Sequence, residues 1–194
     1  MSGNKCQNNL LVLCPLFVCM ASVGWPPFVK SWLQRMWPEN ADTQKFYEEL
    51  FEKLVKVLLV WKDAESIKEP VPISDFEAVR SLCQLFETLH TEDHGLAGPE
   101  NKPLPFSPEY AAAAERWFVF AVMWSLLAAV DNKGRLQCDT QVREIGVGNF
   151  PASGKIFDYF VDSTSESKMD WQLWDSRVPS WIPESPTMAF AASK

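Results

Sequence analysis

The segment that decides the fold is WFVFAVMWSLLAAV, residues 117–130. This apolar run is too long for a single β-strand, and it is shorter than the roughly 20 residues that a membrane-spanning helix needs. Glu115 and Arg116 precede it and Asp131 follows it. We therefore predict a helix that is buried on nearly all sides, which requires other helices packed around it.

Two helical patterns lie nearer the start of the chain. Residues 27–37 have helical spacing and Pro38 follows them, so a short helix is predicted to end there. A longer helix is predicted to begin with Asp42 or Thr43 as its N-cap. Its apolar side chains form two adjoining stripes, Phe46, Leu50, Leu54 and Leu58 in one and Tyr47, Phe51, Val55 and Leu59 in the other. The charged side chains of this helix are predicted to face outward, into solvent, namely Glu48, Glu49, Glu52, Lys53 and Lys56.

The clearest local signal is the sequence SDFE, residues 74–77. A Ser followed three residues later by a Glu forms a capping box, so a helix is predicted to begin here. Its apolar residues recur every three or four positions, namely Phe76, Val79, Leu82, Cys83, Phe86 and Leu89. Gly95 is the predicted terminator. Residues 95–108 carry four prolines and two glycines, a composition typical of an exposed loop.

The last third of the chain changes character. Residues 131–134 are predicted to form a turn and residues 135–144 a short helix. Beyond Gly146, the β-prone pieces at residues 155–161 and 171–174 are expected to pair as an antiparallel hairpin across residues 163–167.

The predicted fold is therefore mainly α, a helical bundle followed by a short α+β segment with a β-hairpin. We divide the chain into three parts. Residues 1–23 are an apolar leader or a truncated strand, residues 24–145 are the helical domain, and residues 146–194 are a β-rich connector.

Composition limits the classes of function. The net charge of -7 leaves no excess of Lys and Arg for phosphates, so neither nucleic acid nor an anionic membrane is an expected partner. It also argues against direct contact with the acidic microtubule surface. The cysteines Cys6, Cys14, Cys19, Cys83 and Cys138 form no C-x-x-C pair, which is typical of reduced intracellular thiols.

The N-terminus has two interpretations, which sequence alone leaves open. Lys5, the apolar run of residues 10–20 and the small residues Ala21 and Ser22 resemble a secretory signal, which predicts a small secreted helical binding protein. Alternatively, the run is a buried strand cut from a longer chain. Cleavage near Ala21 would support the first interpretation.

A nucleotide site is considered at residues 148–155, GNFPASGK. A phosphate loop has four residues between its glycines and a Ser or Thr after its Lys, whereas here five residues intervene and Ile156 follows Lys155. Pro151 also removes one backbone N–H donor. A turn before a strand is the better interpretation.

The two histidines, His90 and His94, have the spacing of a helical metal pair. No Glu directly follows His90 and no third ligand is evident, so an exposed helix end is predicted instead. The sequence has no G-x-S-x-G motif for a nucleophilic serine. Trp171, Trp174 and Trp181 are interpreted as clamps that hold an extended connector on a neighbouring domain. We predict no catalytic, cofactor-binding or metal-binding residue in this chain.

Several motifs occur in an order that resembles the dynein heavy chains. GWPP at residues 24–27 and KSWL at 30–33 are similar to the opening of a dynein AAA+ lid. Further matches are Val79 with SLC at 81–83 and Leu85, WFVFAVMWSL at 117–126, Asp131 with Gly134-Arg135, Arg143-Glu144, Phe150-Pro151, Gly154, FDYFVD at 157–162, Trp174, Val178-Pro179 and Pro186. The resemblance covers residues 24–190. It departs upstream of Gly24, where the family has an S-R-x-G-M-V-Y strand and this chain reads VLCPLF at 12–17.

The resemblance implies the lid of the second AAA+ module, the entry to the third, and an axonemal rather than a cytoplasmic dynein. Such heavy chains are microtubule-motor ATPases that use ATP and Mg²⁺, in the cytoplasm, cytoskeleton and ciliary axoneme. The phosphate loop and catalytic acid are not in this chain, so it is expected to have no activity on its own. Its implied partners are the neighbouring AAA+ modules and the dynein complex.

Overall fold

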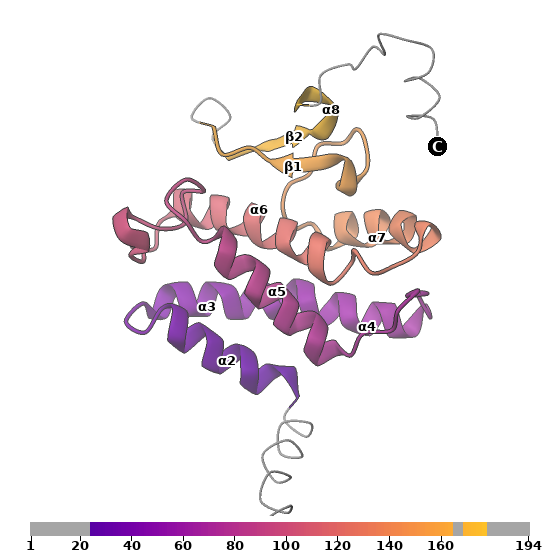
Figure 1. Cartoon of the computed structure of the whole chain (residues 1–194), viewed down its shortest axis with the longest axis horizontal. Coiled ribbons are helices and arrows are strands. Elements are labelled where there is room, and N and C mark those ends of the chain that lie inside the picture. The colour runs from indigo at the N-terminus through magenta and orange to yellow at the C-terminus, as the bar shows by residue number, and fades with distance from the viewer. Residues whose placement is uncertain (1–23, 165–168, 178–194) are drawn as a thin grey trace, which may run out of the picture.

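The computed structural model describes residues 24–164 and 169–177 (Figure 1). The predictions for residues 1–23, whether signal or truncated strand, lie outside these ranges, as do those for Trp181 and Pro186. Within them, the chain is mainly helical and ends in a two-stranded hairpin, which confirms the predicted fold class. The division at residues 145 and 146 stays a prediction.

The first helix, α2, runs from Trp25 to Met36 and buries Val29, Trp32 and Leu33. A long rod follows, made of α3 (Ala41–Leu50), a π-helical turn η1 (Phe51–Val55) and α4 (Lys56–Ala64). The N-cap of the rod is Asn40, whose side chain accepts from the Thr43 N–H. The prediction of Asp42 or Thr43 as N-cap was therefore wrong, because Asn40 provides the same oxygen one turn earlier.

The π-helical turn in the rod was not predicted, but its cause lies in the sequence. The two apolar stripes repeat every four residues, whereas an α-helix has 3.6 residues per turn. A π-turn accommodates the extra fraction of a residue and keeps both stripes on one side. Tyr47, Phe51, Val55 and Leu59 are all buried, as are Leu50, Leu54 and Leu58.

Helix α5 spans Asp75–Leu89, and the predicted capping box is present, with the Ser74 hydroxyl accepting from the Glu77 N–H. Its end was predicted too late. The helix stops at Leu89, and Gly95 lies in the following turn with a φ of 65°. The loop after it, which includes the 3₁₀ turn η2 (Pro99–Asn101), is only partly exposed, since Leu96 and Ala97 are buried.

The decisive apolar segment lies in α6, Pro108–Ser125, which Ser107 caps. Most of its apolar side chains are buried, as predicted. Trp124 is the largest exception, with 38% of its surface exposed. The helix ends at Ser125, five residues before the end of the apolar run at Val130.

Helix α7 spans Asn132–Ile145, and Asp131 caps it by accepting from the Gly134 N–H. The predicted turn at residues 131–134 is therefore the cap and first turn of this helix. A Cβ on Gly134 would lie 3.1 Å from Cγ2 of Ile67, so the α4–α5 connection sits directly on this turn.

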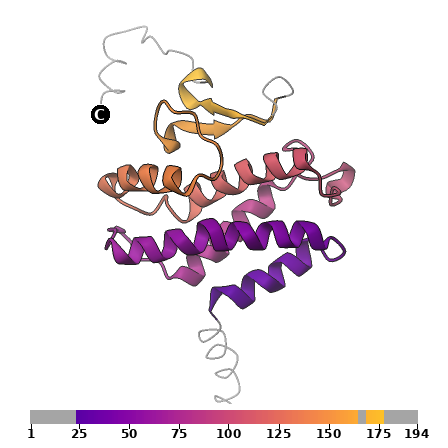
Figure 2. The same ribbon diagram turned by 180° about the vertical axis from the view of Figure 1, so that it is seen from behind.

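The chain ends in a small β element. The 3₁₀ turn η3 (Ile156–Asp158) leads into β1 (Tyr159–Val161), which pairs antiparallel with β2 (Trp171–Leu173), and the short helix α8 (Trp174–Arg177) follows. Tyr159 faces Leu173 and Val161 faces Trp171. The hairpin prediction is confirmed. The hairpin lies on the side of α6 and α7 that faces away from α2, in front and rear views alike (Figures 1 and 2).

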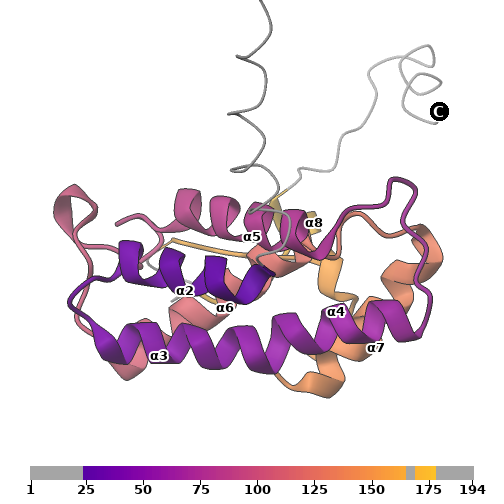
Figure 3. The same ribbon diagram turned by 90° about the horizontal axis from the view of Figure 1, so that it is seen from below.

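An aromatic cluster joins five of the helical segments to one another. It contains Trp32 of α2, Trp37 after it, Tyr47 of α3, Phe51 of η1, Phe86 of α5 and Phe118 of α6. The Phe118 ring lies 5.1 Å from Phe51, 5.5 Å from Phe86 and 5.9 Å from Tyr47, mostly edge to face. Seen from below, α2 runs alongside α3 (Figure 3). The bundle therefore has one core, and Phe118 is at its centre.

The central ring gives a direct stability test. Replacing Phe118, which is fully buried, by Ala is expected to lower the free energy of unfolding by about 3–5 kcal/mol, because a large cavity replaces three ring contacts. Val60→Ala is the control, since Val60 is 64% exposed, and its effect is expected to stay within about 0.5 kcal/mol. Urea unfolding followed by circular dichroism measures both, and similar losses for the two variants would contradict the packing.

Candidate coupling site between the bundle and the hairpin

Arg143 of α7 holds the loop that leads from the bundle to the hairpin. Its Nη1 donates to the Pro151 carbonyl at 2.7 Å and its Nη2 to the Gly154 carbonyl at 3.1 Å. Its Nε donates to Asp139 Oδ1 at 3.1 Å, one helical turn earlier. The same oxygen accepts from the Ile156 N–H at 2.8 Å. One guanidinium and one carboxylate thus fix the middle and the end of the loop on α7.

Gly148 connects α6 to the second strand through its own peptide groups. Its N–H donates to Glu115 Oε1 of α6 at 2.8 Å, and its carbonyl accepts from the indole N–H of Trp171 at 2.5 Å. Gly148 has a φ of 86°, and a Cβ there would lie 3.2 Å from Val119. Glycine adopts this conformation without strain, and any Cβ here would force Val119 to shift. We call this connection, from Glu115 through Gly148 to Trp171, the Gly148 relay.

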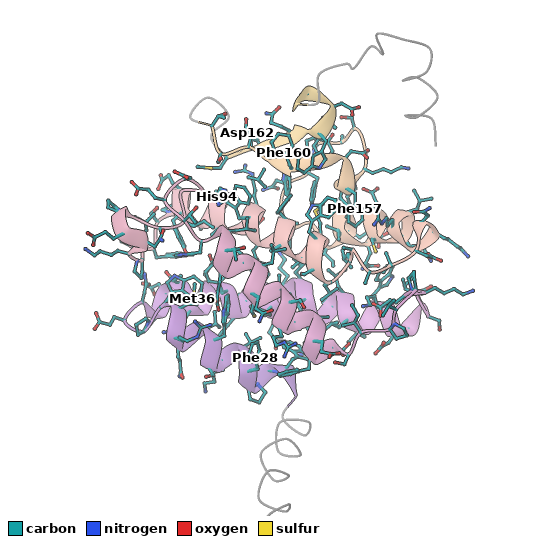
Figure 4. The ribbon with its side chains drawn as sticks, viewed as in Figure 1. Phe28, Met36, His94, Phe157, Phe160 and Asp162 are labelled. Atoms are coloured by element: carbon teal, nitrogen blue, oxygen red, sulfur yellow. The ribbon has the colours of Figure 1, made fainter. Side chains whose placement is uncertain are left out.

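Two further contacts hold the hairpin on α6. The Trp171 ring stacks on Phe150 of the loop at 4.2 Å and is buried, while the predicted clamping onto a neighbouring domain stays a prediction. Asp170 Oδ1 lies 3.5 Å from Arg116 Nε and accepts from the Trp171 N–H. Trp174 packs on Phe160 but remains 39% exposed. Phe157 and Phe160 lie between α8 and the bundle (Figure 4).

The geometry shows why the loop at residues 148–155 does not suit a phosphate. Three of the backbone N–H groups in and next to it already donate to carboxylates: Gly148 to Glu115, Lys155 to Asp158 and Ile156 to Asp139. A phosphate would meet these negative charges where a phosphate loop offers free donors. The residues present do not fit a nucleotide, and the interpretation as a turn before a strand describes the loop correctly.

The histidines are not at an exposed helix end, so that prediction was wrong. His90 is the C-cap of α5 and is only 7% exposed, because its ring packs against Trp37 and Phe86. His94 is half-buried, stacks on Trp117 and bonds through Nδ1 to the Leu89 carbonyl. Burial lowers the pKa of His90. The spacing of the histidines gave no sign of this, since each ring also packs on a tryptophan that is distant along the chain, Trp37 for His90 and Trp117 for His94.

Other chemistry is sparse among residues 24–164 and 169–177. There, no group of three or more His, Cys, Asp and Glu side chains is placed to hold a metal ion. None of the helices described is long and apolar enough to cross a membrane. Cys83 and Cys138 are free and buried, and burial raises the pKa of the Cys138 thiol to about 11.

The role of Arg143 is testable by removing its guanidinium. Arg143→Met is expected to lower the free energy of unfolding by about 2 kcal/mol and to speed hydrogen exchange at the Ile156 amide, because Asp139 loses the partner that orients it. Arg135→Met is the control, since exposed Arg135 of the same helix lies over the Phe157 ring instead. Equal exchange in the two variants would refute the assignment.

The burial of His90 predicts a pH dependence. Burial lowers the pKa of His90 in the folded state, whereas the unfolded chain binds a proton with the ordinary pKa near 6.5, so stability is full above pH 6.5 and falls as the pH drops below it. The contribution is at most about 1.4 kcal/mol per pH unit. His90→Gln should flatten the dependence between pH 7 and 5 in thermal unfolding, whereas His94→Gln should retain it. An unchanged slope in His90→Gln would contradict this.

Known proteins resemble this chain over most of its length. The sequence model for the dynein heavy chain AAA lid domain matches residues 47–176. Dynein axonemal heavy chain 2 of Homo sapiens is 33% identical over 162 residues, 83% of this chain and 3% of that protein. The ciliary dynein beta chain of Tripneustes gratilla is 27% identical over 183 residues, 90% of this chain and 4% of that protein.

A third relative, the dynein-1-beta heavy chain of the flagellar inner arm I1 complex of Chlamydomonas reinhardtii, is 25% identical over 190 residues, 84% of this chain and 4% of that protein. The chain thus spans only a few per cent of the length of these relatives. The matched region includes the bundle from Tyr47 onward, the Gly148 relay and the hairpin. The resemblance is confirmed at the level of the family, and the chain belongs to the dynein heavy chain family through its AAA lid domain.

Proposed function

We propose that these residues act as a non-catalytic lever in an axonemal dynein heavy chain, where they couple ATP-driven conformational change between AAA+ modules during microtubule-based ciliary movement. Within the heavy chain, the lever is the lid of the second module together with the entry to the third. The motifs at residues 24–33 and 157–162 support that position. The names of the axonemal, ciliary and flagellar relatives support the setting in the axoneme.

The observation that carries the proposal is the Gly148 relay. It joins α6, the central helix of the bundle, to β2 by two hydrogen bonds through the backbone of one residue. A rotation of the bundle therefore moves the hairpin with it, because the aromatic core on one side and the Arg143 contacts on the other resist any shift of the hairpin relative to the bundle. The bundle and the hairpin then move as one rigid body, and the change of conformation takes place outside it.

The proposal assigns no ATP turnover to these residues. In the family, ATP and Mg²⁺ are bound by other parts of the heavy chain, and the loop at residues 148–155 does not fit a phosphate. The partners of the lever are the neighbouring AAA+ modules and, through them, the dynein complex in the cytoskeleton of the axoneme. Contact with the microtubule, a nucleic acid or a membrane is not part of the proposal, consistent with the net charge of -7.

The test is a heavy chain motor that contains this segment and carries Trp171→Phe. Phenylalanine keeps the stack on Phe150 but removes the indole N–H that donates to Gly148. We expect the basal ATPase rate to stay within about twofold, because no residue that binds nucleotide changes, and microtubule gliding velocity to fall several-fold, because rotation is no longer passed on in full.

Trp174→Phe is the matched control, since the Trp174 ring is 39% exposed. Gliding velocity should be unchanged in that variant. Thermal unfolding of each variant separates a coupling defect from a folding defect. A Trp171→Phe motor that folds normally and glides at the speed of the unaltered motor would refute the proposed role of the relay.

A further inference from the structure

A groove of about 550 Å³ runs along the first half of α6. Its floor is one face of the helix, made by positions i, i+3, i+4 and i+7, which are Glu109, Ala112, Ala113 and Arg116. The loop between α5 and α6 forms one wall and contributes Leu104 to the lining. The volume lies in the range of about 300–1,000 Å³ that is usual for binding pockets.

The groove has opposite charges at its two ends and a small, apolar floor between them. Glu109 and Arg116 are seven residues apart in the helix, so they lie about 10 Å apart along its axis. Asp170 Oδ1 lies 3.5 Å from Nε of Arg116, and the Asp170 side chain is 59% exposed. A pair this long and this exposed holds the guanidinium only weakly. Since a guanidinium has five N–H donors, Arg116 is able to bind a second carboxylate.

Met169 borders the groove at the end where Arg116 lies. It precedes Asp170 in the chain, and a Cβ on Gly95 would lie 3.2 Å from its Cε, so the Met169 side chain reaches the loop between α5 and α6. An unbranched thioether side chain adapts its shape to what it contacts. The groove therefore has an adaptable apolar wall beside its positive charge.

The width of the groove favours an extended occupant over a helical one. Over about 10 Å of length, the volume corresponds to a cross-section of about 50 Å², or a width of about 7 Å. An α-helix with its side chains is about 10–12 Å across, which is too wide to enter. Three residues of a β-strand cover the length, but residues three apart point to opposite faces of the strand. In a polyproline II segment, residues three apart lie on the same side and about 9 Å apart.

We propose that this groove binds a proline-rich segment of a partner protein in the polyproline II conformation. A basic side chain of the segment pairs with Glu109, and an acidic side chain three positions along pairs with Arg116. Two prolines between these charges pack on Ala112 and Ala113. Proline suits this floor because it has no N–H, and the methyl groups of the floor offer no acceptor. The site goes beyond the proposed function and does not depend on it, because binding is measured on this chain by itself.

The probe is the capped peptide acetyl-Lys-Pro-Pro-Glu-amide, titrated into the full 194-residue chain while NMR follows the methyl signals of Ala112, Ala113 and Met169. We expect saturable shifts of these three signals, with a Kd on the order of a millimolar because the ligand is small. Signals that do not move with up to about 10 mM peptide would overturn the proposal.

The charge pattern is tested by exchanging a charge. Arg116→Glu makes both ends of the groove acidic, so it should weaken this peptide by about tenfold and strengthen acetyl-Lys-Pro-Pro-Lys-amide by a similar factor. Lys133→Glu changes the net charge equally at an exposed site on α7, and it should alter both affinities by less than about twofold. A variant Arg116→Glu that still prefers the peptide ending in Glu would contradict the assignment.

A second variant decides the question even if Arg116→Glu does not fold. Ala112 is exposed on the floor of the groove, so Ala112→Trp should fill the groove and leave the midpoint of thermal unfolding nearly unchanged. We expect the peptide to cause no shift of the Ala113 and Met169 methyl signals in this variant. Binding as tight as that of the unaltered chain would show that the peptide lies elsewhere and would overturn the proposal.

Discussion

The contact of Phe118 with the rings of Tyr47, Phe51 and Phe86 is the constraint on which the other features depend. A helix that is apolar on nearly all sides has no stable position unless partners cover it from several directions. The α3–η1–α4 rod and α5 cover α6 on one side, and the loop and hairpin cover it on the other. The position of α6 thus determines where every other element must lie.

The two sides of α6 are held in different ways. On the bundle side the contacts are apolar and aromatic, so they tolerate small shifts but resist separation. On the hairpin side, the contacts are hydrogen bonds between defined atoms: Glu115 accepts from the Gly148 N–H, and Arg143 and Trp171 donate to backbone carbonyls. Directional bonds set an orientation that apolar packing alone leaves loose. A lever needs both properties, a stiff body and a defined attachment.

Sequence patterns predicted the features that depend on neighbours in the chain. The capping box at Ser74, the apolar stripes of the rod and the hairpin follow from residues a few positions apart, and all three are present. The burial of His90 and the Gly148 relay could not be predicted in this way. His90 is covered by Trp37, and Gly148 is held by Glu115 from 33 residues away, through backbone atoms that carry no sequence signal. The family resemblance, which draws on whole motifs, predicted the kind of domain, which the local patterns alone did not.

The stiffness of the Gly148 relay depends on the residues that surround Gly148. Its central residue has no side chain, and a positive φ together with the 3.2 Å approach to Val119 makes any larger residue there strained. The stiffness of the relay therefore comes entirely from its neighbours, with Val119 beneath it, Phe150 stacked on Trp171 beside it, and the Arg143 contacts beyond. Since glycine by itself is the most flexible residue, the transmission of motion here depends on packing around the peptide rather than on the peptide. Substitutions in that surrounding shell are then expected to alter coupling even where they touch neither the bundle core nor the strands.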